Sequence, residues 1–396
     1  MTPPERHPIE RFETGSVVTL AAGHAIHDAY AGFLAPLLPI FIANFGLSNT
    51  QAGLLTVFAQ GPSLTQPLIG HLAGRVNLRL LVVVAPAVTA VMMSLLGVAP
   101  TYAIIALLLL IRGLSSAGLH SIGAVMAGNL SGGRLGRGMG YWMVGGALAS
   151  TMGPLVIVSA VRVLGLQQTP WLMIGGLLTS ALLYVRLRDV PVRPPGSAQG
   201  LPWRQALQGM RPLLVPLTGL VIVRSFMSAM LFTFLPTLLS EEGADLWIAG
   251  AALSVVGAAG IIGALLGGSL SDRLGRRAVL LGSMIITPLL MFIFLEARGW
   301  AQMPLLFLLG ITSQSIPPVI MALVQESYAQ NRAMANGMYL ALSFVLRSGA
   351  VVVLGMLADL FGLRWAFSAS AVIALLGCPI VLFLPLLPSR PPPSPP

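Results

Sequence analysis

The feature that most constrains the fold is a succession of apolar stretches, each about as long as a membrane is thick. A helix needs about 20 apolar residues to cross a bilayer. Because hydrocarbon offers no partner to an unpaired backbone amide, such stretches must be helical. The chain is therefore predicted to be an all-α membrane protein with twelve transmembrane helices. They lie near residues 17–41, 50–70, 79–98, 101–127, 138–163, 169–187, 212–238, 247–268, 278–296, 302–324, 337–358 and 365–388.

The composition excludes a water-soluble fold. Hydrophobic residues make up 56% of the 396 residues and charged residues only 9%, which a soluble core of this size could not hide. No cleavage site follows the first apolar stretch, so we expect it to remain in the mature chain. The single cysteine, Cys378, excludes disulfides and a multi-cysteine metal site. No nucleophile elbow, glycine-rich phosphate loop or H-E-x-x-H pattern occurs, so neither an enzyme nor a cofactor is predicted.

The basic residues predict the orientation. All 22 are arginines, which suggests a GC-rich bacterial genome. With both termini cytoplasmic, sixteen arginines lie inside and three outside, as the positive-inside rule requires. We expect a multi-pass protein of the bacterial inner membrane without a nucleic-acid partner, since no basic stripe occurs. The sixteen are Arg6, Arg11, Arg75, Arg79, Arg134, Arg137, Arg186, Arg188, Arg193, Arg204, Arg211, Arg273, Arg276, Arg277, Arg332 and Arg390.

A weak internal repeat predicts two similar halves. A Pro/Gly/Arg-rich stretch at 187–211 reads as a cytoplasmic linker between a six-helix bundle at 1–186 and another at 212–390, with a proline-rich tail at 391–396. A nearly constant offset across the linker favours two pseudo-symmetric bundles around a central cavity. The matching pairs are Pro39 and Pro236, Ala52 and Ala249, Gly53 and Gly250, Gly70 and Gly268, Arg134 and Arg332, and Gly138 and Gly337.

The first apolar stretch contains three ionisable side chains, His24, His27 and Asp28, whose spacing places them on one helix face. A charge at bilayer depth costs at least about 2.5–3.5 kcal/mol, so such residues usually line a functional cavity. Proton coupling is the leading interpretation, and a structural contact between helices is the alternative. A transition-metal site is less favoured, because three ligands on one turn would have no acid elsewhere to join them.

Two loops resemble a known transporter motif. The loop after the eighth stretch matches the G-x-L-x-D-R-x-G-R-R pattern of the major facilitator superfamily, and the loop after the second, with Gly70 and Arg75, is a degenerate copy in which Gly74 replaces the acid. The glycines would let helices approach closely, and the arginines could bond an acid and hold one conformation shut. The predicted gating residues of the second loop are Gly268, Asp272, Arg273, Arg276 and Arg277, with Glu326 as the acid.

Further patches resemble the fosmidomycin-resistance branch of this superfamily. The resemblance implies a twelve-helix transporter with alternating access, in this branch typically a proton-driven exporter of small molecules. The patches are His27-Asp28-x-Tyr30 with Leu37-Leu38-Pro39, Gly46-Leu47-Ser48, Gln51-Ala52-Gly53, Gln66-Pro67-Leu68-Ile69-Gly70, Arg224-Ser225-Phe226 with Phe234-Leu235-Pro236, and Gly355-Met356-Leu357-Ala358-Asp359.

The same resemblance assigns two more features. In the superfamily, helices one and four line one cavity, so Arg112 is expected to face Asp28 and take part in proton coupling; bonding to backbone carbonyls alone is the alternative. Small residues every fourth position resemble the antiporter-type packing helix, although Val156 to Val158 replace its final glycines, and generic tight packing is an equal explanation. These residues are Gly145, Ala149, Gly153 and Pro154.

Positive charge at membrane depth suggests what is carried. The interiors of the apolar stretches contain three arginines, Arg112, Arg224 and Arg347, but only one acidic residue, Asp28. The missing anion is a substrate, a lipid headgroup or an acid from a loop; alternatively, the arginines are structural ties to carbonyls. Guanidinium groups bind carboxylate or phosphate well, so we predict an anionic substrate. The predicted substrate-binding residues are Tyr30, Arg224, Arg347, Gln314 and His120.

The sequence therefore favours a proton-coupled exporter, a drug or small-organic-anion antiporter. The expected partners are an anionic small molecule, protons and membrane lipid, and the protein is expected to act as a monomer. Two other classes stay open. One is a carrier without proton antiport, such as an anion uniporter, a sugar-phosphate carrier or a lipid carrier. The other is a membrane receptor or scaffold that transports nothing.

Overall fold

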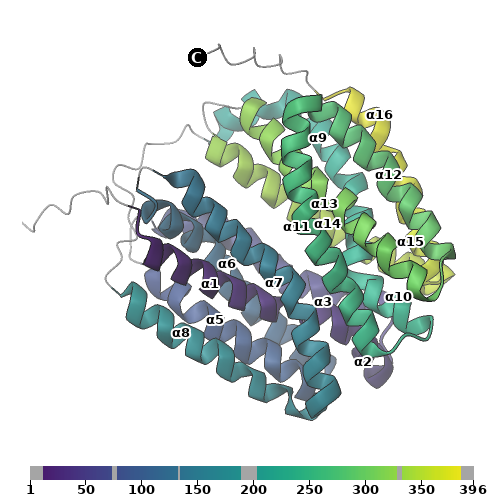
Figure 1. The fold of residues 1–396 in the computed structure, drawn as a ribbon, viewed down its shortest axis with the longest axis horizontal. Helices are drawn as coiled ribbons and strands as arrows, with labels where there is room; N and C mark the ends of the chain where they lie inside the picture. The colour runs from purple at the N-terminus through teal and green to yellow at the C-terminus, as the bar shows by residue number, and fades with distance from the viewer. Residues whose placement is uncertain (1–11, 74–77, 133, 189–202, 328–331, 385–396) are drawn as a thin grey trace, which may run out of the picture. The chain divides into compact units, whose positions relative to one another are not determined.

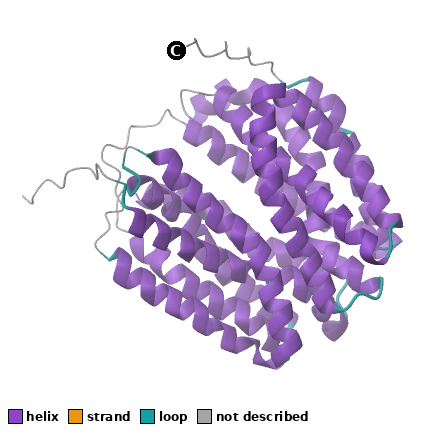
Figure 2. Cartoon of the chain, in the orientation of Figure 1, coloured by secondary structure: helices purple, strands orange, loops and turns teal. Residues whose placement is uncertain are grey.

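The computed structural model describes residues 12–73, 78–132, 134–188, 203–327 and 332–384 (Figure 1). Within these ranges the chain is helical throughout, joined by short loops, and contains no strand (Figure 2). Eleven helices in the described ranges are long and apolar enough to cross a membrane. The all-α membrane class predicted from the sequence is confirmed.

The stretch predicted at 50–70 is not among those eleven. It forms α3 (Asn49–Gln60), the 3₁₀ segment η1 (Gly61–Thr65) and α4 (Gln66–Ala73). Pro62 has no N–H to donate to the preceding turn, so the α-helical hydrogen-bond ladder is interrupted there. Neither helix piece is long enough to span a membrane alone, and Gln51, Gln60 and Gln66 make the stretch less apolar than the eleven spans.

Contacts divide the chain into two compact units: Met1–Ala198 with Phe232–Ala258, and Gln199–Leu231 with Ala259–Pro396. Unit 1 has apolar cores around Phe33 and Leu37 and around Ile122 and Trp142. Besides α3, η1 and α4, it contains α1 (Thr14–Ala31), α2 (Leu34–Phe45), α5 (Arg79–Ser94), η2 (Leu95–Val98), α6 (Tyr102–Asn129), α7 (Leu135–Leu164), η3 (Leu166–Leu172), α8 (Met173–Leu187), α10 (Leu235–Glu241) and the first part of α11 (Leu246–Leu274).

Unit 2 has one described apolar core, which includes Leu217, Leu280 and Val324. It contains α9 (Trp203–Ala229), the remainder of α11, α12 (Arg276–Glu296), η5 (Gly299–Ala301), α13 (Gln302–Ser327), α14 (Arg332–Phe361), α15 (Leu363–Leu375) and α16 (Gly377–Leu382). A π-helical segment, η4 (Met230–Phe234), follows α9 and lies on the boundary between the two units.

The predicted division at 187–211 stays a prediction. Residues 189–202 and the tail 391–396 lie outside the described residues. One difference is visible: α9 begins at Trp203, so residues 203–211 are helical rather than extended linker. Glutamine, alanine, leucine, methionine and arginine in this run all favour helix, which the nearby prolines and glycines obscured at the sequence level.

Helices α1 and α7 pack closely in unit 1, and glycines on α7 make this possible. A Cβ atom added at Gly145 would lie 2.5 Å from the carbonyl oxygen of Ala21, and one at Gly153 would overlap the carbonyl oxygen of Ala29. Ala149, between them, is buried. The ring of Pro154 lies beside Gly32 at the end of α1. The small-residue face of α7 therefore fits directly against the helix that carries Asp28.

We expect Gly153→Val to destabilise unit 1, because the added carbons would push α7 away from α1. Overpacking of this kind costs about 1–3 kcal/mol. Thermal unfolding of the purified protein in detergent would measure the change. Gly140→Val is the matched control on the same helix, since a Cβ there meets nothing within 4 Å. Equal stability of the two variants would contradict the close-packing interpretation.

Candidate functional site

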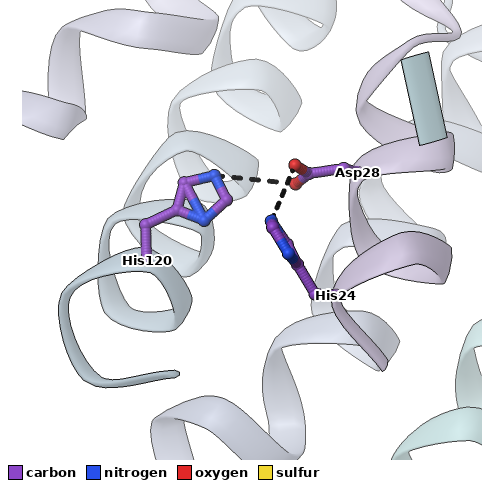
Figure 3. A group of neighbouring side chains, drawn as sticks. All are labelled: His24, Asp28 and His120. Carbon is purple, nitrogen blue, oxygen red and sulfur yellow. Dashed lines mark ion pairs between the residues drawn. The ribbon is translucent and has the colours of Figure 1, made fainter. Parts of the chain in front are cut away.

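Asp28 on α1 is surrounded by three histidines. The nearest carboxylate oxygens lie 3.1 Å from His24 Nε2, 2.8 Å from His27 Nδ1 and 3.6 Å from His120 Nε2. His24 and Asp28 are one helical turn apart on α1, while His120 reaches them from α6 (Figure 3). We call these four residues the Asp28 cluster. The sequence already grouped His24, His27 and Asp28. The structure adds His120, which the sequence had placed among the substrate-binding residues.

Contacts on α7 fix the position of His24. Its Nδ1 lies 3.0 Å from the carbonyl oxygen of Trp142, and its ring stacks on the indole at 3.8 Å with an interplanar angle of 12°. A Cβ added at Gly146 would lie 3.0 Å from the His24 ring, so the glycine leaves room for the histidine. The sequence did not point to Trp142, because an aromatic residue in an apolar stretch carries no signal of its partner.

His27 is fully buried. Its Nδ1 contacts Asp28, while its Nε2 has no hydrogen-bond partner. An ionised carboxylate only accepts hydrogen bonds, so His27 donates from Nδ1 when Asp28 is charged. The side chains of Asp28 and His120 are 22% and 31% exposed, so the cluster is accessible from their side. The Asp28 cluster therefore offers several proton-binding atoms, the ring nitrogens of its histidines and the carboxylate oxygens of Asp28.

Arg112 does not pair directly with Asp28 here. Its Nη1 donates to the carbonyl oxygen of Ala59 at 3.2 Å, and its Nε is buried without a hydrogen-bond partner. Ala59 lies just before the break at Pro62, where the backbone carbonyls of the preceding turn lose a donor. Arg112 is still close enough for its charge to act on Asp28. The predicted direct pair is thus replaced by a bond to a carbonyl freed at a helix break.

The other predicted substrate residues fall into both units. In unit 1, the hydroxyl of buried Tyr30 donates to the carbonyl oxygen of Leu172. Unit 2 contains Arg224 on α9 and Arg347 on α14, and among the residues that the structure describes the buried Nε of Arg224 has no hydrogen-bond partner. Gln314 on α13 lies beside Gly260 of α11. Their role in binding substrate stays a prediction.

The predicted gating residues of the second loop meet inside unit 2. Arg276 Nη2 lies 2.7 Å from Asp272 Oδ1 and 2.9 Å from Glu326 Oε1, and Arg276 also donates to Ser271. This arginine thereby connects the ends of α11 and α13 to the start of α12. Arg277 instead donates to the carbonyl oxygens of Leu382 and Leu384. Arg273 is exposed.

The sequence predicted that Gly268 lets two helices approach closely, but in the structure the adjacent Gly267 does so. A Cβ at Gly268 meets nothing within 4 Å, whereas one at Gly267 would lie 2.5 Å from the carbonyl oxygen of Ser315. Consecutive residues of a helix point about 100° apart, so only one of the two glycines can face α13. In the first loop, Arg75 lies outside the described residues, and nothing is described around Gly70.

We expect Glu326→Gln to disturb this connection more than Asp272→Asn. Glu326 accepts from both Nη2 and Nε of Arg276, and the side chain of Asp272 is 65% exposed. Because exposed ion pairs contribute about 0–1 kcal/mol, both effects should be small. Cysteine accessibility in transport-competent protein would measure any conformational shift. A larger shift for Asp272→Asn would contradict the assignment of Glu326 as the main partner.

Comparison with known families decides the class. The sequence matches the Major Facilitator Superfamily over residues 20–273 and 217–396. The chain belongs to this superfamily. Its twelve transmembrane helices therefore form the two pseudo-symmetric six-helix bundles of the major facilitator fold, with the second crossing interrupted at Pro62. Superfamily membership makes the chain a multi-pass membrane transporter and not an enzyme.

Curated relatives include drug-resistance proteins. The fosmidomycin resistance protein of Escherichia coli strain K12 is 23% identical over 386 residues, covering 95% of this chain and 94% of the relative. The multi-drug resistance efflux pump PmrA of Streptococcus pneumoniae is 23% identical over 317 residues, covering 77% and 79%. The resemblance to the fosmidomycin-resistance branch, inferred from short patches, is confirmed.

Solved structures support the fold. An inward-facing bacterial homologue of the human lysosomal transporter Spinster aligns with a TM-score of 0.80 at 15% identity, covering 97% of this chain and 99% of that structure. A D-xylose-proton symporter aligns with a TM-score of 0.76 at 16% identity, covering 94% and 98%. At such low identity the likeness shows the fold alone.

Proposed function

We propose that this transporter exports small organic molecules in exchange for protons. The observation that carries the proposal is the Asp28 cluster, a carboxylate held by three imidazoles within two membrane helices. Ionisable groups at membrane depth are costly and mark proton or substrate pathways. The names of the relatives, drug-resistance and efflux proteins, support export as the direction.

The proposed cycle uses the cluster as an exchangeable proton site. Protonation of Asp28 converts an acceptor-only carboxylate into a group that can donate, so its contacts with the three histidines must rearrange. Each protonation state therefore favours a different arrangement of α1 and α6, and alternating access follows if these arrangements open to different sides. Arg112 would stabilise the charged form of Asp28 from its position near Ala59.

We further propose that the cargo carries an acidic group. Arg224 and Arg347 are two cationic side chains on membrane helices of unit 2, and planar guanidinium groups bind carboxylate, phosphate or phosphonate through paired hydrogen bonds. An acidic cargo would offset their positive charge.

Flux into proteoliposomes tests the function. An acidic small molecule such as fosmidomycin, suggested by the name of one relative, should move against its gradient when a pH gradient is imposed and stop when an ionophore dissipates it. Flux that is independent of the gradient would favour the uniporter, sugar-phosphate or lipid carrier. Absence of flux across a wide set of compounds would favour a receptor or scaffold.

We propose that both termini and the 187–211 segment are cytoplasmic, in a bacterial inner membrane, because this orientation satisfies the positive-inside rule. Single cysteines at Ser197 and Asn44, introduced after Cys378→Ser removes the one native thiol, should react with a membrane-impermeant reagent from opposite sides. Labelling from the same side would overturn the proposed orientation.

A further inference from the structure

We propose that His24, Asp28 and His120 also form a binding site for one divalent transition-metal ion, with Zn²⁺ the best match. Each residue offers one ligand atom, and these atoms all lie within 4.8 Å of one another. In a tetrahedral zinc site, bonds of about 2.0–2.1 Å place neighbouring ligands roughly 3.3 Å apart. His24 Nε2 lies 3.1 Å from Oδ2 of Asp28, which is close to that value, and His120 Nε2 lies 3.6 Å from Oδ1, so an ion between the two rings would meet the carboxylate at one or both of its oxygens.

The hydrogen bond between His24 and the Trp142 carbonyl determines which ring nitrogen of His24 is free to bind a metal ion. A carbonyl oxygen can only accept, so His24 Nδ1 must carry the proton in this contact. In the neutral ring, Nε2 then presents a lone pair, and it faces an oxygen of Asp28 at 3.1 Å. Two electron-rich atoms at that distance require a cation between them. A proton on Nε2 is one solution, and a metal ion bound to both atoms is the other.

The surroundings of the three ligands are those of a metal site. A metal-binding histidine usually donates its other N–H to a carbonyl or carboxylate, which fixes the ring. Trp142 provides that carbonyl for His24 and also stacks on its ring. His27 Nδ1 lies 2.8 Å from Oδ1 of Asp28, the oxygen nearest His120, and orients the carboxylate so that Oδ2 faces His24. Gly146 has no side chain beside His24 and Asp28, which keeps the space open.

The ligand set selects the class of metal. Two imidazoles and one carboxylate suit Zn²⁺ and related transition metals, whereas Ca²⁺ and Mg²⁺ require more oxygen ligands. Water can take the fourth position, because Asp28 and His120 are partly exposed. The positive charge of Arg112 nearby opposes a cation, so binding should be weaker than in a closed structural zinc site. The sequence disfavoured a metal site because its three candidate ligands lay on one helical turn. In the structure, His120 supplies a ligand from a second helix.

Metal and protons would use the same lone pairs, so a bound ion should block proton-coupled flux. This consequence rests on the proposed function, but metal binding itself does not. Binding and transport are therefore measured separately, on full-length protein freed of any histidine tag.

The binding experiment uses ZnCl₂ and the purified protein in detergent. Calorimetry should detect one Zn²⁺ per chain, and X-ray absorption should show two imidazole ligands. His24→Ala and His120→Ala should each weaken binding at least about 10-fold, a loss expected when a ligand or its support is removed. Glu296→Ala, which removes an exposed carboxylate on α12, is the control from outside the cluster and should leave binding unchanged. Circular dichroism and thermal unfolding of each variant separate loss of ligand from loss of fold.

His120→Asn provides a second variant if an alanine variant fails to fold, since its partly exposed side chain makes it the mildest change. No Zn²⁺ binding by the folded wild type, or binding that persists in folded His24 and His120 variants, would overturn the metal site. Proton-coupled flux in the same preparation would then still support the proposed function. Conversely, cluster-dependent Zn²⁺ binding without any proton-coupled flux would keep the metal site and remove the proposed function.

Discussion

Asp28→Asn is expected to abolish pH-driven transport, reducing the flux to that of protein-free liposomes. Asparagine has nearly the same shape as aspartate, but it cannot take up and release a proton. Its amide can still form hydrogen bonds with His24 and His27, whose ring nitrogens lie 3.1 and 2.8 Å from the carboxylate, so the packing of α1 against α7 should survive. The variant therefore separates proton coupling from folding.

Two assays make this result specific. Substrate exchange at equal pH on both sides requires no net proton movement, so the variant should retain it if substrate still binds. Asp359→Asn, an exposed carboxylate on α14, is the control for a generic loss of negative charge and should keep pH-driven flux. Full pH-driven activity of Asp28→Asn would show that the Asp28 cluster is structural and that protons, if coupled, use another route.

Arg224→Lys should lose most of the affinity for an anionic substrate even though the charge is kept. Lysine offers a point charge, whereas arginine offers two parallel N–H groups to one carboxylate or phosphate. Hydrogen bonds to charged groups are worth about 1.5–3 kcal/mol, so the expected loss is roughly 10–100-fold. The buried Nε of Arg224, which has no hydrogen-bond partner in the described part of the chain, is the donor that a ligand would satisfy.

Equilibrium binding of acidic and neutral analogues of one compound would measure this loss. Arg364→Lys is the matched control, because Arg364 binds Glu296 in an ion pair whose carboxylate side chain is 85% exposed. The anionic-substrate proposal fails if neutral or cationic analogues bind as tightly as the anion. It also fails if Arg224→Ala and Arg347→Ala both leave binding unchanged.

The sequence by itself determined the membrane class and the positions of most helices. Hydropathy reports the cost of moving a segment from water into lipid, which depends on that segment alone. The grouping of His24 and Asp28 followed for the same reason, because residues four apart on one helix must be neighbours. Likewise, the small residues at 145, 149, 153 and 154 indicated a closely packed face before its partner was known.

Tertiary structure decided which helices meet. His120 joins Asp28 from α6, Trp142 holds His24 from α7, and Arg112 bonds the carbonyl of Ala59 instead of Asp28. Such contacts depend on crossing angles and helix rotation, which no single segment specifies. The helix break at Pro62 is another example. The sequence contains the proline, but the bond between Arg112 and the carbonyl of Ala59 forms only because α3 and α6 pack together. The candidate metal site has this origin as well, since its third ligand comes from a helix about 90 residues further along the chain.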